Sequence, residues 1–266
     1  MSKNSRYVSH QPDHNGYIDW PAEEHQRWQA LVERQLQLLP GRACDEYMQG
    51  LQLLGLSNER IPQLSEINQV LGQTTGWQVT QVPALIDFDH FFRLLADKQF
   101  PVATFIRSQH EFEYLQEPDI FHEVFGHCPL LTNPAFAHFT HTYGKLGLHA
   151  SKQERVFLAR LYWFTVEFGL VNTVDGVRIY GGGILSSPGE TLHALDTRAC
   201  QHRPLDPLAV LRTPYRIDIM QPLYYVLNAF DDLFCLTELN MPALIEQAKQ
   251  AGLLPALFPA KNSLAS

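Results

Sequence analysis

Two histidines lie five residues apart in the stretch Glu117-Pro118-Asp119-Ile120-Phe121-His122-Glu123-Val124-Phe125-Gly126-His127-Cys128-Pro129. The Pro-Asp pair at its start favours a helix N-terminus, where the fixed φ of proline and a negative charge are both suitable. Each residue of a regular α-helix turns by about 100°, so five steps overshoot the starting face by about 140°. The imidazoles of His122 and His127 can therefore meet at one metal ion only if the helix departs from regular geometry. Gly126 would allow that departure.

A third metal ligand is expected, because two neutral imidazoles alone would hold a metal ion loosely. The best candidate is Glu167, which lies within the strongly apolar run 162–170. A carboxylate is costly to bury there unless it is paired or binds a cation. The alternative is a buried salt bridge to Arg155 or Arg160. Two histidines and one carboxylate would form the facial triad of non-haem Fe(II) oxygenases, although ligand type alone does not distinguish iron from zinc.

The composition narrows the classes of function. The chain has 266 residues, of which 45% are hydrophobic and 18% are charged, and its net charge is −8. This charge argues against nucleic-acid binding, which needs clustered Lys and Arg. The four cysteines are far apart and form no C-x-x-C pair, which favours reduced thiols. We see no signal peptide and no run near the roughly 20 apolar residues of a membrane span, so we expect a cytoplasmic protein without a membrane partner.

Hydrophobic periodicity predicts a mainly α-helical chain with a few short strands. Helices are expected at residues 22–39, 45–54, 66–74 (with Ser65 as the N-cap), 87–98, 134–146, 152–170, 206–211 and 221–239. Short strands are expected at residues 101–107 and 177–180. No internal repeat or flexible linker is visible, so we expect one domain over residues 1–266, with a polar N-terminal arm at 1–16 and a frayed tail at 255–266.

Several segments together resemble the catalytic domain of the pterin-dependent aromatic amino acid hydroxylases, and most closely that of the short bacterial phenylalanine 4-hydroxylases. The resemblance extends over about residues 15–240. One departure is Leu115-Gln116, where animal members of the family have Thr-Pro. The motifs that carry the resemblance are Tyr114-Leu115-Gln116-Glu117-Pro118-Asp119, His122-Glu123-Val124-Phe125-Gly126-His127, Tyr162-Trp163-Phe164-Thr165-Val166-Glu167-Phe168-Gly169-Leu170, Tyr180-Gly181-Gly182-Gly183-Ile184-Leu185-Ser186-Ser187 and Gln221-Pro222-Leu223-Tyr224-Tyr225-Val226.

The resemblance implies a role for each matching residue of this chain. The iron ligands would be His122, His127 and Glu167, and Glu123 would be the catalytic acid beside the pterin. The pterin would contact a loop, one stacking aromatic ring and two helical residues, which match Leu85, Ile86, Phe88, Phe91, Ala159 and Tyr162. The substrate carboxylate would pair with an arginine, and its ring would meet aromatic and small residues, which match Arg107, Trp163, Phe168, Gly183 and Ser186.

The same resemblance implies the reaction. With Fe(II), a tetrahydropterin and O2, the protein would hydroxylate L-phenylalanine to L-tyrosine, as in phenylalanine catabolism. Ile217 stands where the tyrosine hydroxylases have Asp, and an apolar residue there suits phenylalanine, because the hydroxyl of tyrosine would be buried without a partner. Tryptophan remains an alternative substrate. We expect a monomer, because the tail lacks the long amphipathic helix with which animal members tetramerise.

Two other classes of function remain open. A zinc hydrolase would use His122 and His127 as ligands and Glu123 as the base. Its usual motif is H-E-x-x-H, however, and the spacing here is one residue longer. A non-catalytic protein that binds a pterin or an aromatic amino acid is the other alternative, with the histidines buried for structure.

Overall fold

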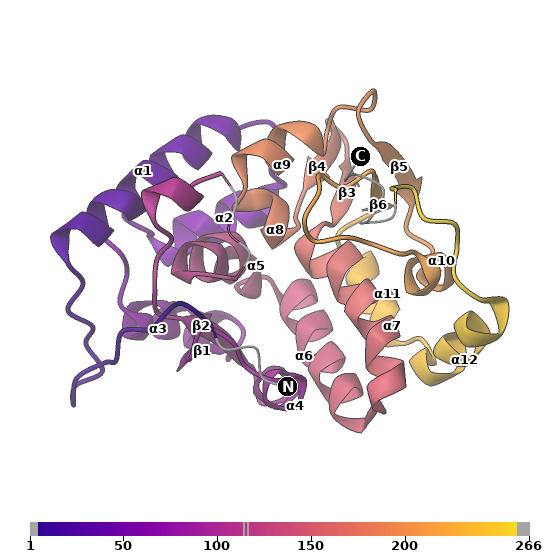
Figure 1. Ribbon diagram of the computed structural model, residues 1–266, viewed down its shortest axis with the longest axis horizontal. Coiled ribbons are helices and arrows are strands. Elements are labelled where there is room, and N and C mark those ends of the chain that lie inside the picture. The colour runs from indigo at the N-terminus through magenta and orange to yellow at the C-terminus, as the bar shows by residue number, and fades with distance from the viewer. Residues whose placement is uncertain (1–4, 114, 116, 260–266) are drawn as a thin grey trace.

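Helices form the body of the molecule, and two small sheets lie apart from each other, the β1–β2 pair at the lower left and the four-stranded sheet at the upper right of the view (Figure 1). The computed structural model describes residues 5–113, 115 and 117–259. The mainly α fold with a few short strands is confirmed. The α-helices are α1 (Ala22–Leu38), α2 (Asp45–Leu54), α3 (Leu64–Thr74), α4 (Phe88–Ala96), α5 (Cys128–Leu131), α6 (Pro134–His149), α7 (Lys152–Tyr162), α8 (Gly182–Leu185), α9 (Pro188–His193), α10 (Pro207–Arg212), α11 (Asp232–Thr237) and α12 (Met241–Ala251).

The strands form one parallel pair and one four-stranded sheet. The parallel pair is β1 (Gln78–Val82) with β2 (Gln99–Ala103). The second sheet has the order β4-β3-β6-β5, in which β3 is antiparallel to β4 and parallel to β6, and β6 is parallel to β5. Its strands are β3 (Leu170–Thr173), β4 (Gly176–Ile179), β5 (Gln201–Pro204) and β6 (Leu223–Leu227).

Three shorter helical pieces connect the longer elements. One is a 3₁₀ turn, Gln109–Glu111. The other two are π-helical turns: the first π-turn is Phe121–His127 and the second π-turn is Trp163–Glu167. The first π-turn leads directly into α5, and the second continues α7. The segments that carry the candidate metal ligands are thus the parts of the chain where the helices widen.

Local sequence explains most helix boundaries. The side chain of Asp87 accepts a hydrogen bond from His90 N and caps α4, as Asp at an N-cap does in general. Helix α2 ends at Gly55, whose φ of 58° is the left-handed conformation that glycine adopts at little cost. Trp28 and Leu31 on α1 are buried in the core, which agrees with the periodicity of that helix.

The predicted helix at 221–239 is wrong over its first half. Residues Leu223–Leu227 form β6, all five of whose residues are buried. Its sequence, Leu-Tyr-Tyr-Val-Leu, is rich in aromatic and apolar residues, which fit a central strand covered on both faces. A continuous apolar run does not distinguish a buried strand from a buried helix by periodicity alone. Only Asp232–Thr237 is helical in the second half.

Three other boundaries differ from the prediction. Helix α3 begins at Leu64, not after Ser65, because the Glu66 side chain accepts a hydrogen bond from Gln63 N and makes Gln63 the cap. The strand expected at 101–107 is β2, which starts and ends earlier. The single helix expected at 152–170 divides into α7, the second π-turn and the start of β3.

The N-terminal arm follows the edge of the small sheet. His10 N donates to Thr104 O, and the Ser9 hydroxyl donates to Val82 O while accepting from Thr104 N. Of the tail expected at 255–266, residues 260–266 lie outside the described part. Among the residues that the structure describes, no helix is long and apolar enough to cross a membrane.

Candidate metal centre

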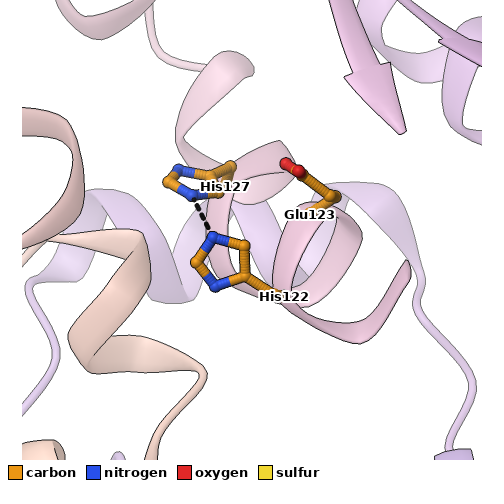
Figure 2. A group of neighbouring side chains, drawn as sticks. All are labelled: His122, Glu123 and His127. Atoms are coloured by element: carbon orange, nitrogen blue, oxygen red, sulfur yellow. Dashed lines mark hydrogen bonds between the residues drawn. The ribbon is translucent and has the colours of Figure 1, made fainter. Parts of the chain in front are cut away.

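The first π-turn brings the two histidines together. His122 Nε2 lies 3.1 Å from His127 Nε2, and the rings meet nearly at right angles (Figure 2). A π-helix closes i→i+5 hydrogen bonds, so residues five apart lie one above the other, as residues four apart do in an α-helix. The departure from regular geometry expected from the spacing is therefore confirmed, and it extends over the whole turn.

Glu167 completes a triangle of donor atoms. Its Oε2 lies 3.6 Å from His122 Nε2 and 3.4 Å from His127 Nε2. A first-row metal ion bound about 2.1 Å from each donor separates neighbouring donors by about 3.0 Å at right angles and about 3.4 Å in a tetrahedron. The observed separations agree with these values. The three atoms can thus hold one ion, and the donor set is that of a facial triad.

The salt bridge considered for Glu167 is not formed with either arginine. Arg155 pairs with Asp89 and donates to Gly147 O. Arg160 donates to the backbone oxygen of Leu211. The cationic or metal-binding partners of the Glu167 carboxylate are the two histidines.

The protonation states suit metal binding. Burial lowers the pKa of His122 to about 4, so its ring is neutral at pH 7. Burial alone would raise the pKa of Glu167, but the His127 and His122 imidazoles and a hydrogen bond from His127 outweigh it and lower that pKa. The ring can therefore offer a lone pair and the carboxylate a negative charge without first losing a proton at neutral pH.

Ser186 sets the tautomer of His122. The Ser186 hydroxyl donates to Gly182 O at 2.8 Å, so it accepts from His122 Nδ1 at 2.9 Å. A proton on Nδ1 leaves the Nε2 lone pair free to face the ion. Ser186, which the resemblance placed in the substrate pocket, here contacts a candidate metal ligand.

Glu123 lies beside the triad and differs from Glu167 in its ionisation. Donor atoms of His122, Glu123 and His127 all lie within 4.8 Å of one another (Figure 2). Burial raises the pKa of Glu123 well above its ordinary value, and the nearby carboxylates of Glu167 and Asp119 add to this. A carboxyl group that keeps its proton is a poorer metal ligand and a better proton donor. We therefore assign the third ligand position to Glu167.

The glycine run 181–183 lies directly against the candidate ligands. A Cβ at Gly182 would lie 2.4 Å from Cε1 and Nδ1 of His127, and a Cβ at Gly183 would lie 3.0 Å from Glu167 Oε2. Gly126 permits the same close approach from the other side, because a Cβ there would lie 2.7 Å from Gly182 O. The lack of side chains at these glycines thus lets the backbone pack directly against the candidate ligands. Gly126 both relaxes the turn and makes room for the backbone of Gly182.

Two of the residues matched to the amino-acid pocket, Trp163 and Phe168, form an aromatic wall beside Glu167. The rings of Trp163 and Phe168 lie 4.3 Å apart, and a Cβ at Gly183 would meet both Glu167 Oε2 and Phe168 Cε2 at 3.0 Å. Tyr215 stacks on the other face of Trp163 at 4.5 Å. No motif or spacing in the sequence singles out Tyr215.

Arg107 is buried and bound to Asp119. Its Nε and Nη2 donate to the two carboxylate oxygens of Asp119 at 2.9 and 2.8 Å, and its backbone N–H adds a third bond. Asp119 also accepts from His122 N, so it links the arginine to the first π-turn. The pair with Asp119 uses one edge of the guanidinium, the edge formed by Nε and Nη2.

Most of the residues matched to the pterin lie in or just before the N-terminal part of α4, and the other two, Ala159 and Tyr162, lie on α7. The Phe91 ring packs against Tyr162 at 5.6 Å and is half-buried. Leu85 and Phe88 are exposed, and Ile86 and Ala159 are partly exposed. Tyr162 directly precedes the second π-turn, so this face adjoins the turn that carries Glu167. A flat ring system would find an exposed aromatic and aliphatic surface there.

The comparisons with known proteins identify the family of the chain. The family model for biopterin-dependent aromatic amino acid hydroxylases matches residues 5–240. Phenylalanine-4-hydroxylase of Pseudomonas aeruginosa is 62% identical over 261 residues, covering 98% of this chain and 99% of that protein. The chain belongs to the biopterin-dependent aromatic amino acid hydroxylase family.

Other members of the family are similar along nearly their whole length. Phenylalanine-4-hydroxylase of Vibrio cholerae is 57% identical and covers 97% of this chain and 89% of that protein. The apo phenylalanine hydroxylase of Colwellia psychrerythraea superposes with a TM-score of 0.94 at 57% identity, covering 96% of this chain and 99% of that chain. The Chromobacterium violaceum enzyme with bound Fe(III) has a TM-score of 0.87 at 42% identity, with 95% and 94% covered.

Proposed function

We propose that the protein is an iron- and tetrahydropterin-dependent monooxygenase that hydroxylates L-phenylalanine to L-tyrosine with O2. The observation that supports this most strongly is the triangle of His122, His127 and Glu167 donor atoms, set beside an aromatic wall. Its geometry matches a facial triad, which leaves up to three positions on the ion for other ligands. Iron and the reduced pterin, when bound, supply the redox chemistry that activates dioxygen.

The residues of the chain hold and orient the reactants. His122, His127 and Glu167 would hold the ion, and Ser186 keeps the His122 lone pair turned toward it. Phe91 offers a ring face to the pterin. Because Glu123 retains its proton next to the triad, it can donate that proton to an oxygen atom of a bound reactant.

The substrate would be fixed at both of its ends. Its carboxylate would pair with Arg107, whose charge stays fixed because the Asp119 carboxylate holds the guanidinium in place. Its ring would lie against Trp163 and Phe168, on the side of the site that carries Glu167. Such orientation of a reacting ring contributes to the rate by removing translational and rotational freedom before the chemical step.

We base the preference for phenylalanine on the family match, in which Ile217 stands where the tyrosine hydroxylases have Asp. Isoleucine offers no hydrogen-bonding side chain for a substrate hydroxyl, so tyrosine would lose the solvation of that group on binding. We expect kcat/KM for phenylalanine to exceed that for tyrosine and tryptophan. Equal turnover of the three amino acids would contradict this preference.

The direct test is anaerobic loading with Fe(II), then addition of phenylalanine, a tetrahydropterin and air, with tyrosine measured by chromatography. Tyrosine should form only when all of these components are present. Loaded protein that forms no tyrosine would refute the proposal.

A zinc hydrolase is the alternative with a different prediction for the two carboxylates. In the proposed oxygenase, Glu167→Ala removes a ligand and should abolish iron binding, whereas Glu123→Ala should keep the metal and lower the rate. A hydrolase with Glu123 as its base would tolerate Glu167→Ala. The metal content of the two purified variants therefore distinguishes the oxygenase from the hydrolase.

We also propose that the protein acts as a cytoplasmic monomer. The acidic net charge of −8 and four cysteines without a close pair support this proposal. Light scattering should give the mass of one chain, and a stable tetramer would contradict it.

A further inference from the structure

The Gln221 side chain lies behind the aromatic wall and contacts Trp163. The indole Nε1–H of Trp163 donates to Gln221 Oε1 at 3.1 Å. Trp163 itself is held between two rings, with Tyr215 stacked at 4.5 Å and Phe168 at 4.3 Å. Stacking allows a ring to slide or rotate within its plane, so the hydrogen bond is the contact that fixes the indole in one orientation.

Every polar atom of the Gln221 amide is used. Its Nε2 donates to Arg216 O at 2.8 Å and to Ile219 O at 2.9 Å. The indole can only donate and the two carbonyls can only accept, so the orientation of the amide is determined by its partners. Gln221 is 2% exposed, and water cannot substitute for these bonds. The amide therefore ties Trp163 to the loop that precedes β6.

The backbone of Gln221 is anchored to α9. Its N–H donates to Glu190 Oε1 at 3.1 Å, and its carbonyl accepts from His193 Nε2 at 2.9 Å. The other oxygen of Glu190 is hydrogen-bonded to the Tyr224 hydroxyl on β6. Gln221 is thus held from three sides, by α9, β6 and the preceding loop, and is a rigid support.

The framework of hydrogen bonds that holds Gln221 extends to the candidate metal centre through α8 and α9. Helix α9 follows α8 directly, and Ser186 between them accepts from His122 Nδ1. Trp163 begins the second π-turn, which ends at Glu167. One end of this framework therefore contacts a candidate metal ligand, and its other end fixes the wall against which the substrate ring would lie.

We propose that Gln221 is a positioning residue that acts through Trp163 and sets the depth and tilt at which the aromatic ring of the substrate lies beside the ion. This rests on the proposed function, since it requires that the Trp163 wall receives that ring. It also gives a role to the glutamine at the start of the Gln221-Pro222-Leu223-Tyr224-Tyr225-Val226 motif: strand β6 begins at Leu223 and is structural, and the glutamine that precedes it serves the site.

The first measurement does not depend on activity. The chain has four tryptophans, so a ¹⁵N-labelled, Zn(II)-loaded sample should give four indole N–H signals, and Trp163→Phe identifies the signal of Trp163. In Gln221→Leu, which has a similar shape and no polar atoms, that signal should move to lower proton frequency and exchange faster with water. The other three signals should stay in place. An unchanged Trp163 signal would overturn the proposal.

The second measurement separates positioning from general destabilisation. Gln221→Leu should raise KM for phenylalanine about fivefold to tenfold and lower kcat as well, because a displaced ring binds more weakly and also lies out of its reacting position. The matched control is Gln63→Leu, another buried glutamine, whose amide is bonded to Ile18 N and Ile18 O away from the site. The control should lower the melting temperature and leave KM unchanged. A KM change no larger in Gln221→Leu than in this control would overturn the proposal.

Two further variants cover the remaining outcomes. If Gln221→Leu does not fold, Gln221→Asn keeps the donors for the loop carbonyls but withdraws the acceptor from Trp163, and it should show the same KM increase. In a Trp163→Phe background, replacing Gln221 should change log KM by no more than half of the change that the same replacement causes in the wild-type protein. An equal change in both backgrounds would refute action through Trp163. Wild-type protein that forms no tyrosine would refute the proposed function, whereas the indole signal still decides the role of Gln221.

Discussion

Adding a methyl group at Gly182 should destroy the metal site while leaving the fold in place. In Gly182→Ala the new Cβ would lie 2.4 Å from Cε1 and Nδ1 of His127, about 1 Å closer than ordinary van der Waals contact. The His127 side chain is 1% exposed, so the ring cannot turn away into solvent. A displacement of about 1 Å would lengthen a metal–nitrogen bond of about 2.1 Å beyond bonding distance.

The magnitude follows from the loss of one ligand. Changes around a metal site that leave all ligands in place already weaken affinity by about 10- to 100-fold. We therefore expect Gly182→Ala to weaken Fe(II) binding by at least about 100-fold. Gly183→Ala should cost about tenfold, because its Cβ would lie 3.0 Å from Glu167 Oε2 and small shifts relieve that contact.

The control is a glycine with open space around it. A Cβ at Gly72, an exposed residue of α3, would meet no atom within 4 Å. Gly72→Ala should leave the metal affinity unchanged and raise the free energy of unfolding by about 1 kcal/mol, because alanine is the better helix former. Anaerobic Fe(II) titration in competition with a chelator gives the affinities, and thermal unfolding of the metal-free proteins checks folding. Equal affinity of folded Gly182→Ala and Gly72→Ala would refute the reasoning.

Three other changes test neighbouring contacts. Ser186→Ala removes the acceptor of His122 Nδ1 and should weaken metal binding by about 10- to 100-fold, which calorimetry would detect; unchanged affinity would mean that the bond does not orient the ring. Asp119→Asn leaves the buried Arg107 without its carboxylate and should lower the free energy of unfolding, measured in urea, by about 3 kcal/mol. Burial opposes the ionisation of Asp119, but Arg107 outweighs burial and lowers the pKa of Asp119. The stabilisation by this ion pair should therefore be complete at neutral pH and disappear only as the pH falls below about 3.9. Since burial lowers the pKa of His122 to about 4 from about 6.5 in the unfolded chain, the metal-free protein should lose stability as the pH falls from about 6.5 to 4, and His122→Gln should lose less over that interval.

The helices could be predicted where one face is apolar, and strands β2 and β4 could be predicted from their β-branched or alternating residues, whereas the other strands could not. Helices α1, α2 and α6 were expected within a few residues of their ends. Strand β6 was expected as a helix, because a five-residue apolar run has no alternation from which to infer the structure. Strand β3 was hidden for a similar reason, since the apolar pattern of α7 continues into it without a break. Strands β3 and β6 also pair with each other although they lie far apart in the sequence.

The site was better predicted than its supports. The unusual spacing of His122 and His127, and a carboxylate in an apolar run, are chemical anomalies that a sequence displays directly. Asp119 was expected only to start a helix, and its bonds to Arg107 could not be seen without the fold. Gln221 was quoted as part of a motif, but its contact with Trp163 joins residues 58 positions apart.

The extra residue in the first π-turn is matched by the greater width of that turn. Deleting one residue between His122 and His127 would give the spacing H-E-x-x-H, in which both imidazoles share one side of an ordinary α-helix. A chain lacking Val124 could therefore still present two aligned imidazoles, because the narrower α-helical turn offsets the missing residue. The wide turn seen here and the H-E-x-x-H helix are thus two ways to align one pair of imidazoles, and a single residue separates them.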